Sequence, residues 1–243
     1  MRNFTELERK FKKWKNKVNK TNRYYDKSEL LTMLYKYKKS FSFDVLQGDR
    51  FYRGRIFNLD DVVSNNKQYK EWLNSYDVFQ GYNQKDSGTP PAKFASEGRL
   101  NAKGISFLYT CRDVNTVIYE VRPTRFDVVS VAEGVAQSDL IFADLTYCKA
   151  EEITGYCLAD LIGLIADEFA TPHYAGHNYA FTQYLAGHFM NMGFDGVIFE
   201  SSLNPKGENF VFFYPNDCKF ESSKLFKVDE ITILHHWIPR SEV

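Results

Sequence analysis

Apolar side chains recur at alternating spacings of three and four residues near the start of the chain. This pattern is typical of an amphipathic helix that turns one stripe toward a core. The stripe consists of Phe4, Leu7, Phe11, Trp14 and Val18. A second helix is expected to begin near Asp26 or Ser28, with Glu29 able to close a capping box on Asp26. Its core-facing side chains would be Leu30, Leu31, Leu34 and Tyr35. The first forty residues are therefore predicted to form a helical hairpin.

The rest of the chain mixes strand-like and helix-like patterns. Aromatic and β-branched residues, or alternating apolar and polar positions, predict strands. These segments are 41–57, 105–110, 126–131, 197–200, 210–214 and 228–234, with 139–144 either a strand or a short turn. Helices are predicted within 60–82, at 114–121 behind the N-cap Asp113, at 158–169, and around 182–189 before Gly193. A turn at 204–207 makes 197–214 a predicted β-hairpin.

Length and hydrophobic content set the scale of the fold. With 243 residues, 44% of them hydrophobic, the chain can bury a sizeable core. We expect one large domain, residues 41–243, that carries a helical extension, residues 1–40. No apolar run is long enough to span a membrane, and the charged first residues lack the apolar segment of a signal peptide. The sequence therefore predicts a soluble, cytoplasmic protein with no membrane partner.

Charge is balanced overall but unevenly distributed. The 31 basic and 31 acidic residues give no global field that would favour nucleic acid. Residues 1–40 nevertheless hold thirteen Lys or Arg against four Asp or Glu. The simplest interpretation of this basic face is a solvated surface over ordinary packing, with RNA, membrane or protein binding as alternatives. Nucleic acid is therefore not expected as a partner.

Metal and disulfide chemistry are not expected. The four cysteines are scattered without C-x-x-C spacing, which argues against a zinc site and a disulfide framework and favours reduced thiols. His173 and His177, with His188 and Asp167 as further candidates, form no compact ligand set because the segment between the first two is loop-like.

One stretch, residues 98–121, combines a glycine-bounded loop, a short strand and a helix. Arg99 lies in the loop and Tyr109 on the strand. Glu120 lies on the flank of the helix's buried stripe, if each residue turns about 100°, so its carboxylate can face a cleft. Each has an ordinary alternative, as a loop cation, a core tyrosine or a helix-border charge. Their combination in one stretch is what indicates a site.

Two other segments carry candidate binding residues. Arg53 and Arg55 would share one face of a strand, although surface or salt-bridged arginines are the ordinary alternative. Ser201, Ser202 and Asn209 gather at the mouth of the predicted hairpin. These short hydrogen-bonding side chains suit phosphate or sugar recognition, with turn capping as the alternative.

These residues together resemble the RES domain family over roughly residues 51–215. The matching pieces follow one another in order and at similar spacing. They are Tyr52-Arg53, the G-R-x-N-x-x-G loop at Gly98–Gly104, Leu108-Tyr109, Glu120, Thr182-Gln183, the G-F-D-G turn at Gly193–Gly196 and S-S-x-N-x-x-G-E-N at Ser201–Asn209. The basic helices before residue 41 and a long insert at about 132–175 depart from the family pattern.

The resemblance implies an α+β fold similar to that of ADP-ribosyltransferases, with two short mixed or antiparallel sheets around an NAD-binding cleft. It implies an enzyme that consumes NAD+ by cleaving the bond between nicotinamide and ribose, with water or inorganic phosphate as the acceptor. NAD+ would be the substrate, phosphate a co-substrate, and no cofactor is expected. The family also implies a toxin or defence role with an antitoxin as inhibitory partner, and leaves a homo-oligomer open.

The resemblance assigns catalytic roles to Arg99, Tyr109 and Glu120. Nicotinamide in NAD+ is already a cationic leaving group, so the difficult step is the oxocarbenium-like transition state at the ribose. Glu120 would stabilise this developing charge, and Arg99 nearby would keep the carboxylate ionised. Tyr109 would stack on the nicotinamide or ribose.

The same resemblance assigns substrate binding to Tyr52, Arg53, Ser201 and Asn209. Arg53, together with Arg99, would hold the pyrophosphate through bidentate guanidinium bonds that a lysine would not reproduce. Ser201 would hydrogen-bond a phosphate or a ribose, and Tyr52 would assist. Asn209 would brace the loop.

Two other functions stay open on sequence alone. Transfer of ADP-ribose to a macromolecule would use the same fold and the basic N-terminal helices, although the spacing of Arg99, Tyr109 and Glu120 follows the RES pattern. A non-catalytic interaction module would bind through residues 1–40. A dehydrogenase is disfavoured because no G-x-G-x-x-G follows a strand and no acidic residue lies at the matching distance downstream.

Overall fold

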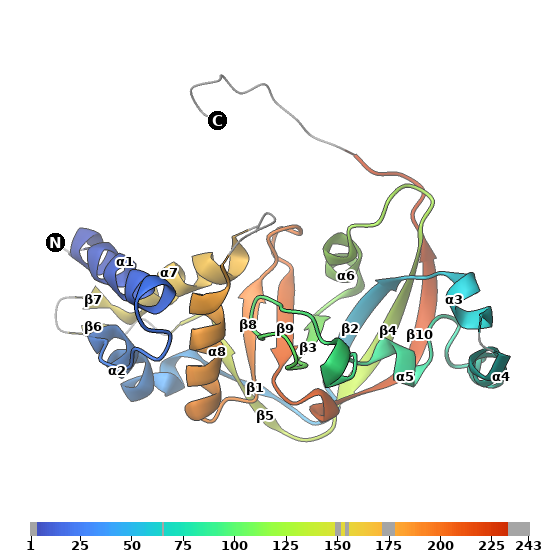
Figure 1. Cartoon of the computed structure of the whole chain (residues 1–243), viewed down its shortest axis with the longest axis horizontal. Helices are drawn as coiled ribbons and strands as arrows, with labels where there is room; N and C mark the ends of the chain where they lie inside the picture. The colour runs from blue at the N-terminus through green and yellow to red at the C-terminus, as the bar shows by residue number, and fades with distance from the viewer. Residues whose placement is uncertain (1–3, 65, 149–151, 154–155, 172–177, 233–243) are drawn as a thin grey trace.

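The fold is built on one eight-stranded mixed sheet with the strand order β1-β5-β8-β9-β3-β2-β4-β10 (Figure 1). The computed structural model describes residues 4–64, 66–148, 152–153, 156–171 and 178–232. The strands of the large sheet are β1 (Ser42–Val45), β2 (Arg50–Ile56), β3 (Leu108–Cys111), β4 (Val128–Ala136), β5 (Leu140–Asp144), β8 (Gly196–Glu200), β9 (Glu208–Phe212) and β10 (Cys218–Lys227). β6 (Glu152–Ile153) and β7 (Tyr156–Cys157) pair separately. Within the large sheet β5 and β8 run parallel, and the other neighbours run antiparallel.

The large sheet is almost divided in two between β2 and β3. These strands share a single aligned pair, Tyr52 with Cys111, whereas β2 and β4 align over seven pairs. By the strand order, five strands therefore lie on one side of the junction and three on the other. The expected α+β class is confirmed. The two short sheets that we expected are the two halves of one sheet, connected through this pair.

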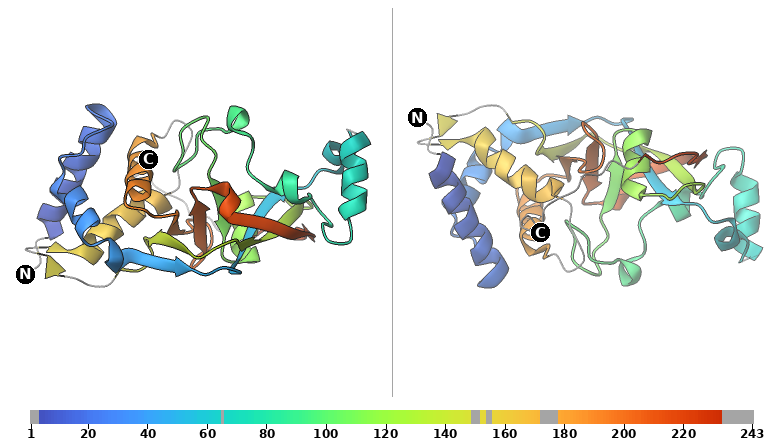
Figure 2. Two further views of the ribbon diagram at one scale, coloured as in Figure 1. Left: turned by 90° about the horizontal axis from the view of Figure 1, so that it is seen from below. Right: turned by 90° about the horizontal axis from the view of Figure 1, so that it is seen from above.

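The α-helices of the described residues are α1 (Phe4–Lys20), α2 (Glu29–Lys36), α3 (Leu59–Val63), α4 (Asn66–Ser75), α5 (Gln84–Ser87), α6 (Val114–Val121), α7 (Leu158–Ala170) and α8 (Ala180–Asn191). α7 and α8 pack against β8, and α6 packs against β2, β3 and β4. Figure 2 shows α1, α2, α7 and α8 gathered at one end of the molecule and α3 and α4 at the other. Within the described residues, no helix is both long and apolar enough to cross a membrane.

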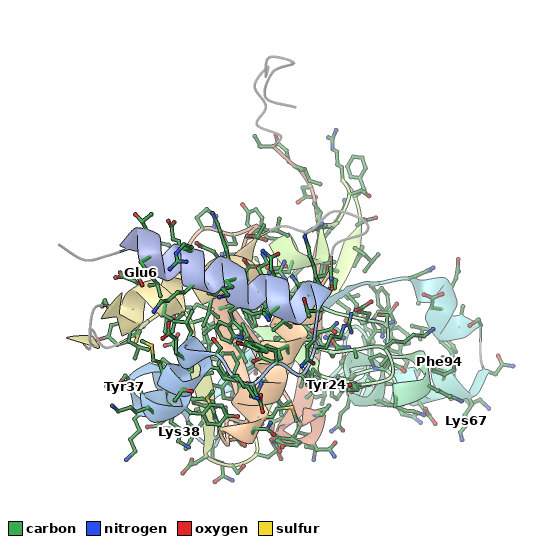
Figure 3. The ribbon with its side chains drawn as sticks, turned by 60° about the vertical axis from the view of Figure 1, so that its left-hand side comes forward. Glu6, Tyr24, Tyr37, Lys38, Lys67 and Phe94 are labelled. Carbon is green, nitrogen blue, oxygen red and sulfur yellow. The ribbon has the colours of Figure 1, made fainter. Side chains whose placement is uncertain are left out.

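Four of the five residues of the predicted stripe of α1 are described and buried. Leu7, Phe11, Trp14 and Val18 are each at most 4% exposed. They belong to the same apolar cluster as residues of α7, α8, β8 and β9. In Figure 3, α1 runs across the surface of the molecule with its polar side chains outward, and Tyr24 follows its C-terminal end. The N-terminal helices therefore share a core with the sheet.

The last strand lies earlier than the sequence predicts. We expected a strand at 228–234, but β10 ends at Lys227, residues 228–232 belong to no strand, and 233–234 lie outside the described residues. β10 escaped prediction because its register with β4 shifts between Phe220 and Ser222. Such a bulge breaks the alternation of apolar and polar positions that identifies a strand.

Candidate active site

A cavity of about 320 Å³ lies where the two halves of the sheet meet. β2, β3, α6, the loop before β3 and the hairpin of β8 and β9 all contribute to its lining. Six of the seven predicted site residues line it: Tyr52, Arg53, Arg99, Tyr109, Glu120 and Asn209. The seventh, Ser201, lies beside it and contacts Glu120. Residues that are far apart in sequence are thus brought around one space.

α6 carries Glu120 to this cavity. The helix begins at its predicted N-cap, because the Asp113 side chain accepts a 2.9 Å hydrogen bond from the backbone N–H of Thr116. It lies directly on β2 at Gly54, where an added Cβ would overlap Val117 and come within 2.7 Å of Cγ2 of Val121. The glycine therefore lets the helix approach the strand closely enough for Glu120 to reach the cavity.

One carboxylate oxygen of Glu120 is fixed by two donors. Oε1 accepts hydrogen bonds from the Ser201 hydroxyl at 2.7 Å and from Nδ2 of Asn209 at 2.9 Å. Oε2 accepts none of the hydrogen bonds between the described residues. Hydrogen bonds to a charged acceptor are the stronger kind. They hold the carboxylate in one orientation and leave its second oxygen for a ligand.

Ser201 has no hydrogen-bonding capacity left for a substrate. Its Oγ donates to Glu120 and accepts from the backbone N–H groups of Leu203 at 3.1 Å and Asn204 at 3.0 Å. A hydroxyl has one donor and two acceptor positions, so all three are used. The neighbouring Ser202 is exposed and lines the cavity instead. The geometry therefore makes Ser201 a residue that positions Glu120. From the sequence we expected Ser201 to contact the ligand.

Asn209 is itself held by a buried thiol. The Cys111 thiol donates to Oδ1 of Asn209 at 3.3 Å, which leaves Nδ2 aimed at Glu120. Burial, and then the charge of Glu120, raise the pKa of Cys111 far above its usual value. The sulfur therefore stays protonated and remains a donor.

The loop before β3 is locked around the hydroxyl of Tyr109. This hydroxyl donates to Oδ1 of Asn101 at 2.7 Å and accepts from the backbone N–H of Leu100 at 3.1 Å. Burial raises the pKa of Tyr109 to about 12, which keeps the donor protonated. A Cβ at Gly98 would overlap the Asn101 side chain and lie 2.8 Å from the Tyr109 oxygen. At the far end of the loop, Gly104 has a φ of +87°, which favours glycine.

The side chain of Asn101 also explains why β3 starts later than predicted. Its Nδ2 donates to the backbone oxygen of Ile105 at 2.8 Å, so that residue is engaged by the loop. β3 consequently begins at Leu108, although the alternating pattern starts at Ile105.

α8 holds the same loop from the other side. The Thr182 hydroxyl donates to the backbone oxygen of Arg99 at 2.5 Å. Nε2 of Gln183 lies within hydrogen-bonding distance of the backbone oxygens of Gly98 at 3.1 Å and Asn101 at 3.0 Å. The Thr-Gln pair therefore fixes the backbone from which the Arg99 side chain extends.

Within the described part of the chain, the guanidinium of Arg99 is bound by a backbone oxygen and by no carboxylate. It donates to the backbone oxygen of Thr171, just after α7, at 3.0 Å and lies 5.8 Å from the ring centre of Phe199. The carbonyl end of a helix carries partial negative charge that favours a cation. Burial lowers the pKa of Arg99, while the charge of Glu120 is among the influences that raise it. None of the ion pairs between described residues involves Arg99.

Arg53 likewise forms none of the ion pairs between described residues. One nitrogen donates to the backbone oxygen of Tyr109 at 2.8 Å, and its buried Nε has no hydrogen-bond partner. Burial, and then the charge of Arg55, lower the pKa of Arg53 to about 10, so it remains a cation near neutrality. An unsatisfied buried donor costs free energy that an anionic ligand would recover.

Comparison with known proteins places these residues in a family. The sequence profile of the RES domain matches residues 75–232, which is more than half of the chain. The chain belongs to the RES domain family. Tyr52 and Arg53 precede the matched segment, whereas the loop, Glu120 and the hairpin lie inside it. No curated protein sequence matches the chain.

The RES domain also aligns with solved structures. This chain aligns with one chain of the crystal structure of the M. tuberculosis MbcT–MbcA toxin–antitoxin complex. The alignment covers 82% of this chain and 92% of that chain. The aligned chains are 13% identical, and the TM-score is 0.47.

The structure adds residues to the site that sequence reasoning did not assign. Among them, Arg122 and Phe199 line the cavity of this RES domain. Arg122 follows α6 in the left-handed conformation, with a φ of 53°. No local pattern marks such a residue, because its position depends on where the helix ends. Ser202, which the sequence grouped with Ser201 and Asn209 as suited to phosphate or sugar recognition, also lines the cavity.

Tyr52 of β2 lines the cavity as predicted. Its hydroxyl donates to Oε2 of Glu133 at 3.0 Å, and Glu133 also pairs with Arg50. Burial, and then the hydrogen bond to Glu133, raise the pKa of Tyr52. The hydroxyl is therefore engaged with Glu133 on the neighbouring strand.

Charge in the cavity is predominantly positive. Arg53, Arg99 and Arg122 line it together with one carboxylate, Glu120. No described group of three or more His, Cys, Asp or Glu side chains could hold a metal ion, and His173 and His177 lie outside the described residues. The arrangement suits an organic ligand with negative charge and a reacting centre near Glu120.

Proposed function

We propose that this RES domain consumes NAD+ by cleaving the N-glycosidic bond between nicotinamide and ribose, with water or inorganic phosphate as the acceptor. One observation carries the proposal. Glu120 is fixed through one oxygen by Ser201 and Asn209, inside a cavity whose arginines form no ion pair with a described carboxylate. NAD+ complements these groups. Its pyrophosphate can accept hydrogen bonds from the arginines, and its ribose becomes cationic in the transition state, where the carboxylate can stabilise it.

Substrate binding would rest on the arginines. Arg53 has an unsatisfied buried Nε, and Arg99 is tethered through a single hydrogen bond to a backbone oxygen. Both therefore keep donors for the pyrophosphate oxygens. The rings of Tyr109 and Phe199 would form apolar walls for the nicotinamide and ribose. Tyr109 cannot offer its hydroxyl, because that group is bound to Asn101 and Leu100.

Bond cleavage would follow from the charge of Glu120. The C1′–N bond of the ribose breaks, and its electron pair leaves with nicotinamide, which becomes neutral. The positive charge that develops at C1′ is stabilised by the nearby carboxylate, whose orientation is set before the reaction. Water or phosphate then forms the new C1′–O bond, and an attacking water releases its proton to solvent. The products are nicotinamide and either ADP-ribose or its 1″-phosphate.

Family membership supports the same reaction and suggests its biological setting. We propose that residues 41–243 form the catalytic unit and that NAD depletion by this protein acts as a toxin or defence activity. An antitoxin-like protein would then be its inhibitor.

Product analysis of the purified protein tests the proposal. NAD+ is incubated with the protein with and without inorganic phosphate, and the products are identified by mass. Nicotinamide release in both conditions is expected from a hydrolase, whereas a phosphorylase stalls without phosphate. Label from NAD+ that accumulates on a macromolecule would instead support ADP-ribose transfer. Intact NAD+ in both conditions would contradict the proposal.

A further inference from the structure

The loop that carries Arg99 is held by two helices. α8 binds its backbone through Thr182 and Gln183, and the backbone oxygen of Thr171, directly after α7, accepts a hydrogen bond from the Arg99 guanidinium. The position of Arg99 therefore depends on where α7 and α8 lie. Neither strand of the hairpin that holds Glu120 takes part in these hydrogen bonds, and its contribution at Arg99 is the ring of Phe199, 5.8 Å from the guanidinium.

α1 packs against α8 on the face next to the loop contacts. Trp14 lies 5.2 Å from the ring centre of Phe181 and 6.0 Å from that of Tyr184, with edge-to-face geometry in both pairs. Its indole N–H donates to the Tyr184 hydroxyl at 3.3 Å. Phe181 and Tyr184 flank Thr182 and Gln183 in the sequence. One turn of α8 thus faces α1 on one side and the Arg99 loop on the other.

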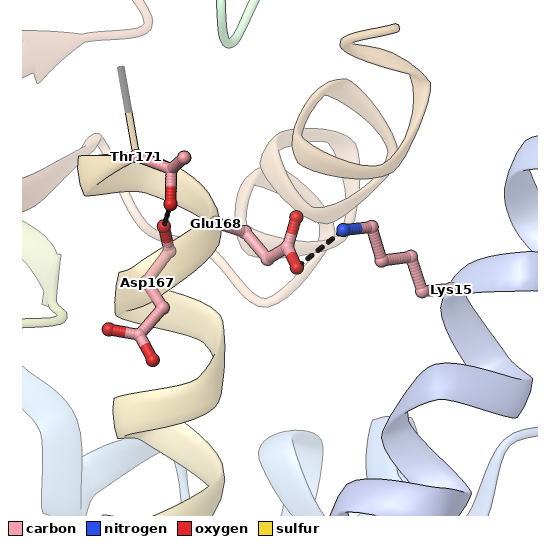
Figure 4. Close-up of polar contacts among 4 residues, drawn as sticks. All are labelled: Lys15, Asp167, Glu168 and Thr171. Atoms are coloured by element: carbon pink, nitrogen blue, oxygen red, sulfur yellow. Dashed lines mark hydrogen bonds and ion pairs between the residues drawn. The ribbon is translucent and has the colours of Figure 1, made fainter. Parts of the chain in front are cut away.

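α1 also contacts the end of α7, as Figure 4 shows. Nζ of Lys15 pairs with Oε1 of Glu168 at 2.6 Å. Next to it, the Thr171 hydroxyl donates to the backbone oxygen of Asp167 at 2.5 Å, and its N–H donates to the same oxygen at 2.9 Å. These bonds fix the residue whose carbonyl receives Arg99. An ion pair that is partly exposed contributes little by itself, so the aromatic contacts of Trp14 are the larger part of this support.

We infer that α1 is a positioning element of the NAD site, which places Arg99 through α7 and α8. The inference rests on the proposed function and deepens it, because it gives the N-terminal extension a role at that site. Glu120 is held by Ser201 and Asn209, which α1 does not contact through any hydrogen bond between described residues. Loosening α1 should therefore weaken NAD+ binding while the chemical step is preserved.

Substitutions on α1 test this role through the division between KM and kcat. Trp14→Leu should raise KM for NAD+ by roughly threefold to tenfold with kcat nearly unchanged, as expected when binding common to substrate and transition state is lost. Lys15→Met should give a smaller rise, and Lys15→Arg should restore the wild-type value. Lys12→Met is the matched control, since Lys12 is an exposed residue of the same helix, and its KM should not change.

A double-mutant cycle separates positioning of Arg99 from general loosening. In the Arg99→Ala background, Trp14→Leu should add little to the loss of NAD+ affinity, because both act through one side chain. The dissociation constants are measured in Glu120→Gln protein so that turnover does not interfere. The inference would be overturned if Trp14→Leu raised the dissociation constant for NAD+ by the same factor with and without Arg99. It would also be overturned by an unchanged KM in folded Trp14→Leu protein.

Hydrogen exchange supplies a readout that needs no NAD+. The N–H of Leu100 is bonded to Tyr109 inside the Arg99 loop. Its exchange should accelerate at least about threefold in Trp14→Leu or Lys15→Met protein, while amides shared by β4 and β10 keep their rates. Unchanged exchange at Leu100 would contradict the inference even if NAD+ is turned over. Faster exchange in a protein that leaves NAD+ intact would instead contradict only the proposed function.

Discussion

The Ser201 hydroxyl donates a 2.7 Å hydrogen bond to Oε1 of Glu120, across 81 positions of the sequence. Two backbone N–H groups hold the same hydroxyl from the other side. A turn of the β8–β9 hairpin is in this way connected to the carboxylate of α6. Through this bond the serine holds the carboxylate in place. The site therefore contains two kinds of residue, those that position Glu120 and those that face the ligand.

Ser201→Ala should reduce kcat more than it raises KM. A hydrogen bond to a charged group contributes about 1.5–3 kcal/mol, so kcat should fall by roughly tenfold to a hundredfold. KM should change little, because Ser201 does not line the cavity. Ser202→Ala is the informative neighbour and should raise KM instead. Steady-state kinetics of nicotinamide release distinguish the two, and a raised KM with normal kcat for Ser201→Ala would return Ser201 to the substrate-binding residues.

Gly98→Ala should destabilise the protein and reduce its activity. The new Cβ would overlap Asn101 and press on the Tyr109 oxygen, and overpacking of this kind typically costs about 1–3 kcal/mol. Gly163→Ala is the matched control, because this helical glycine has open space around its Cβ position. That variant should gain up to about 1 kcal/mol from helix propensity. Denaturant unfolding measures both, and equal stability of the two variants would contradict the packing assigned to Gly98.

His188 should make the protein less stable in mild acid. Burial lowers the pKa of His188 below its usual 6.5, so the unfolded chain binds a proton more readily than the folded chain. Stability is then fully present above pH 6.5 and is lost as the pH falls toward the folded pKa. His188→Gln should lose less stability between pH 7.5 and 5.5 in denaturant unfolding. Identical losses in the variant and the wild type would assign the acid sensitivity to other groups.

Local sequence patterns predicted the elements whose side chains follow one regular period. The stripe from Leu7 to Val18 and the N-cap Asp113 each correspond to a helix in the structure. β10 was missed because its bulge disrupts the pattern. The expected final strand was placed on residues that follow β10. Periodicity therefore succeeded where one face of an element is uniformly buried.

Sequence could predict which residues gather at the cavity, but not how they divide their hydrogen bonds. Motif order brought Arg53, Glu120 and Asn209 to one place. Whether Ser201 or Ser202 faces the ligand depends on a turn whose N–H groups bind the first of them. Arg122 has no motif, since a left-handed residue at a helix end becomes visible only when the helix is built. These assignments depend on three-dimensional geometry that no spacing rule contains.

The most direct test compares two glutamate variants in one assay for nicotinamide release from NAD+. Glu120→Gln keeps the shape of the side chain and removes its charge, whereas Glu221→Gln makes the same change at an exposed position on β10. The wild type and Glu221→Gln should release nicotinamide at equal rates. Glu120→Gln, folded to the same extent, should be slower by about a hundredfold or more. Equal rates for all three proteins would contradict the role of the Glu120 charge in breaking the bond to nicotinamide.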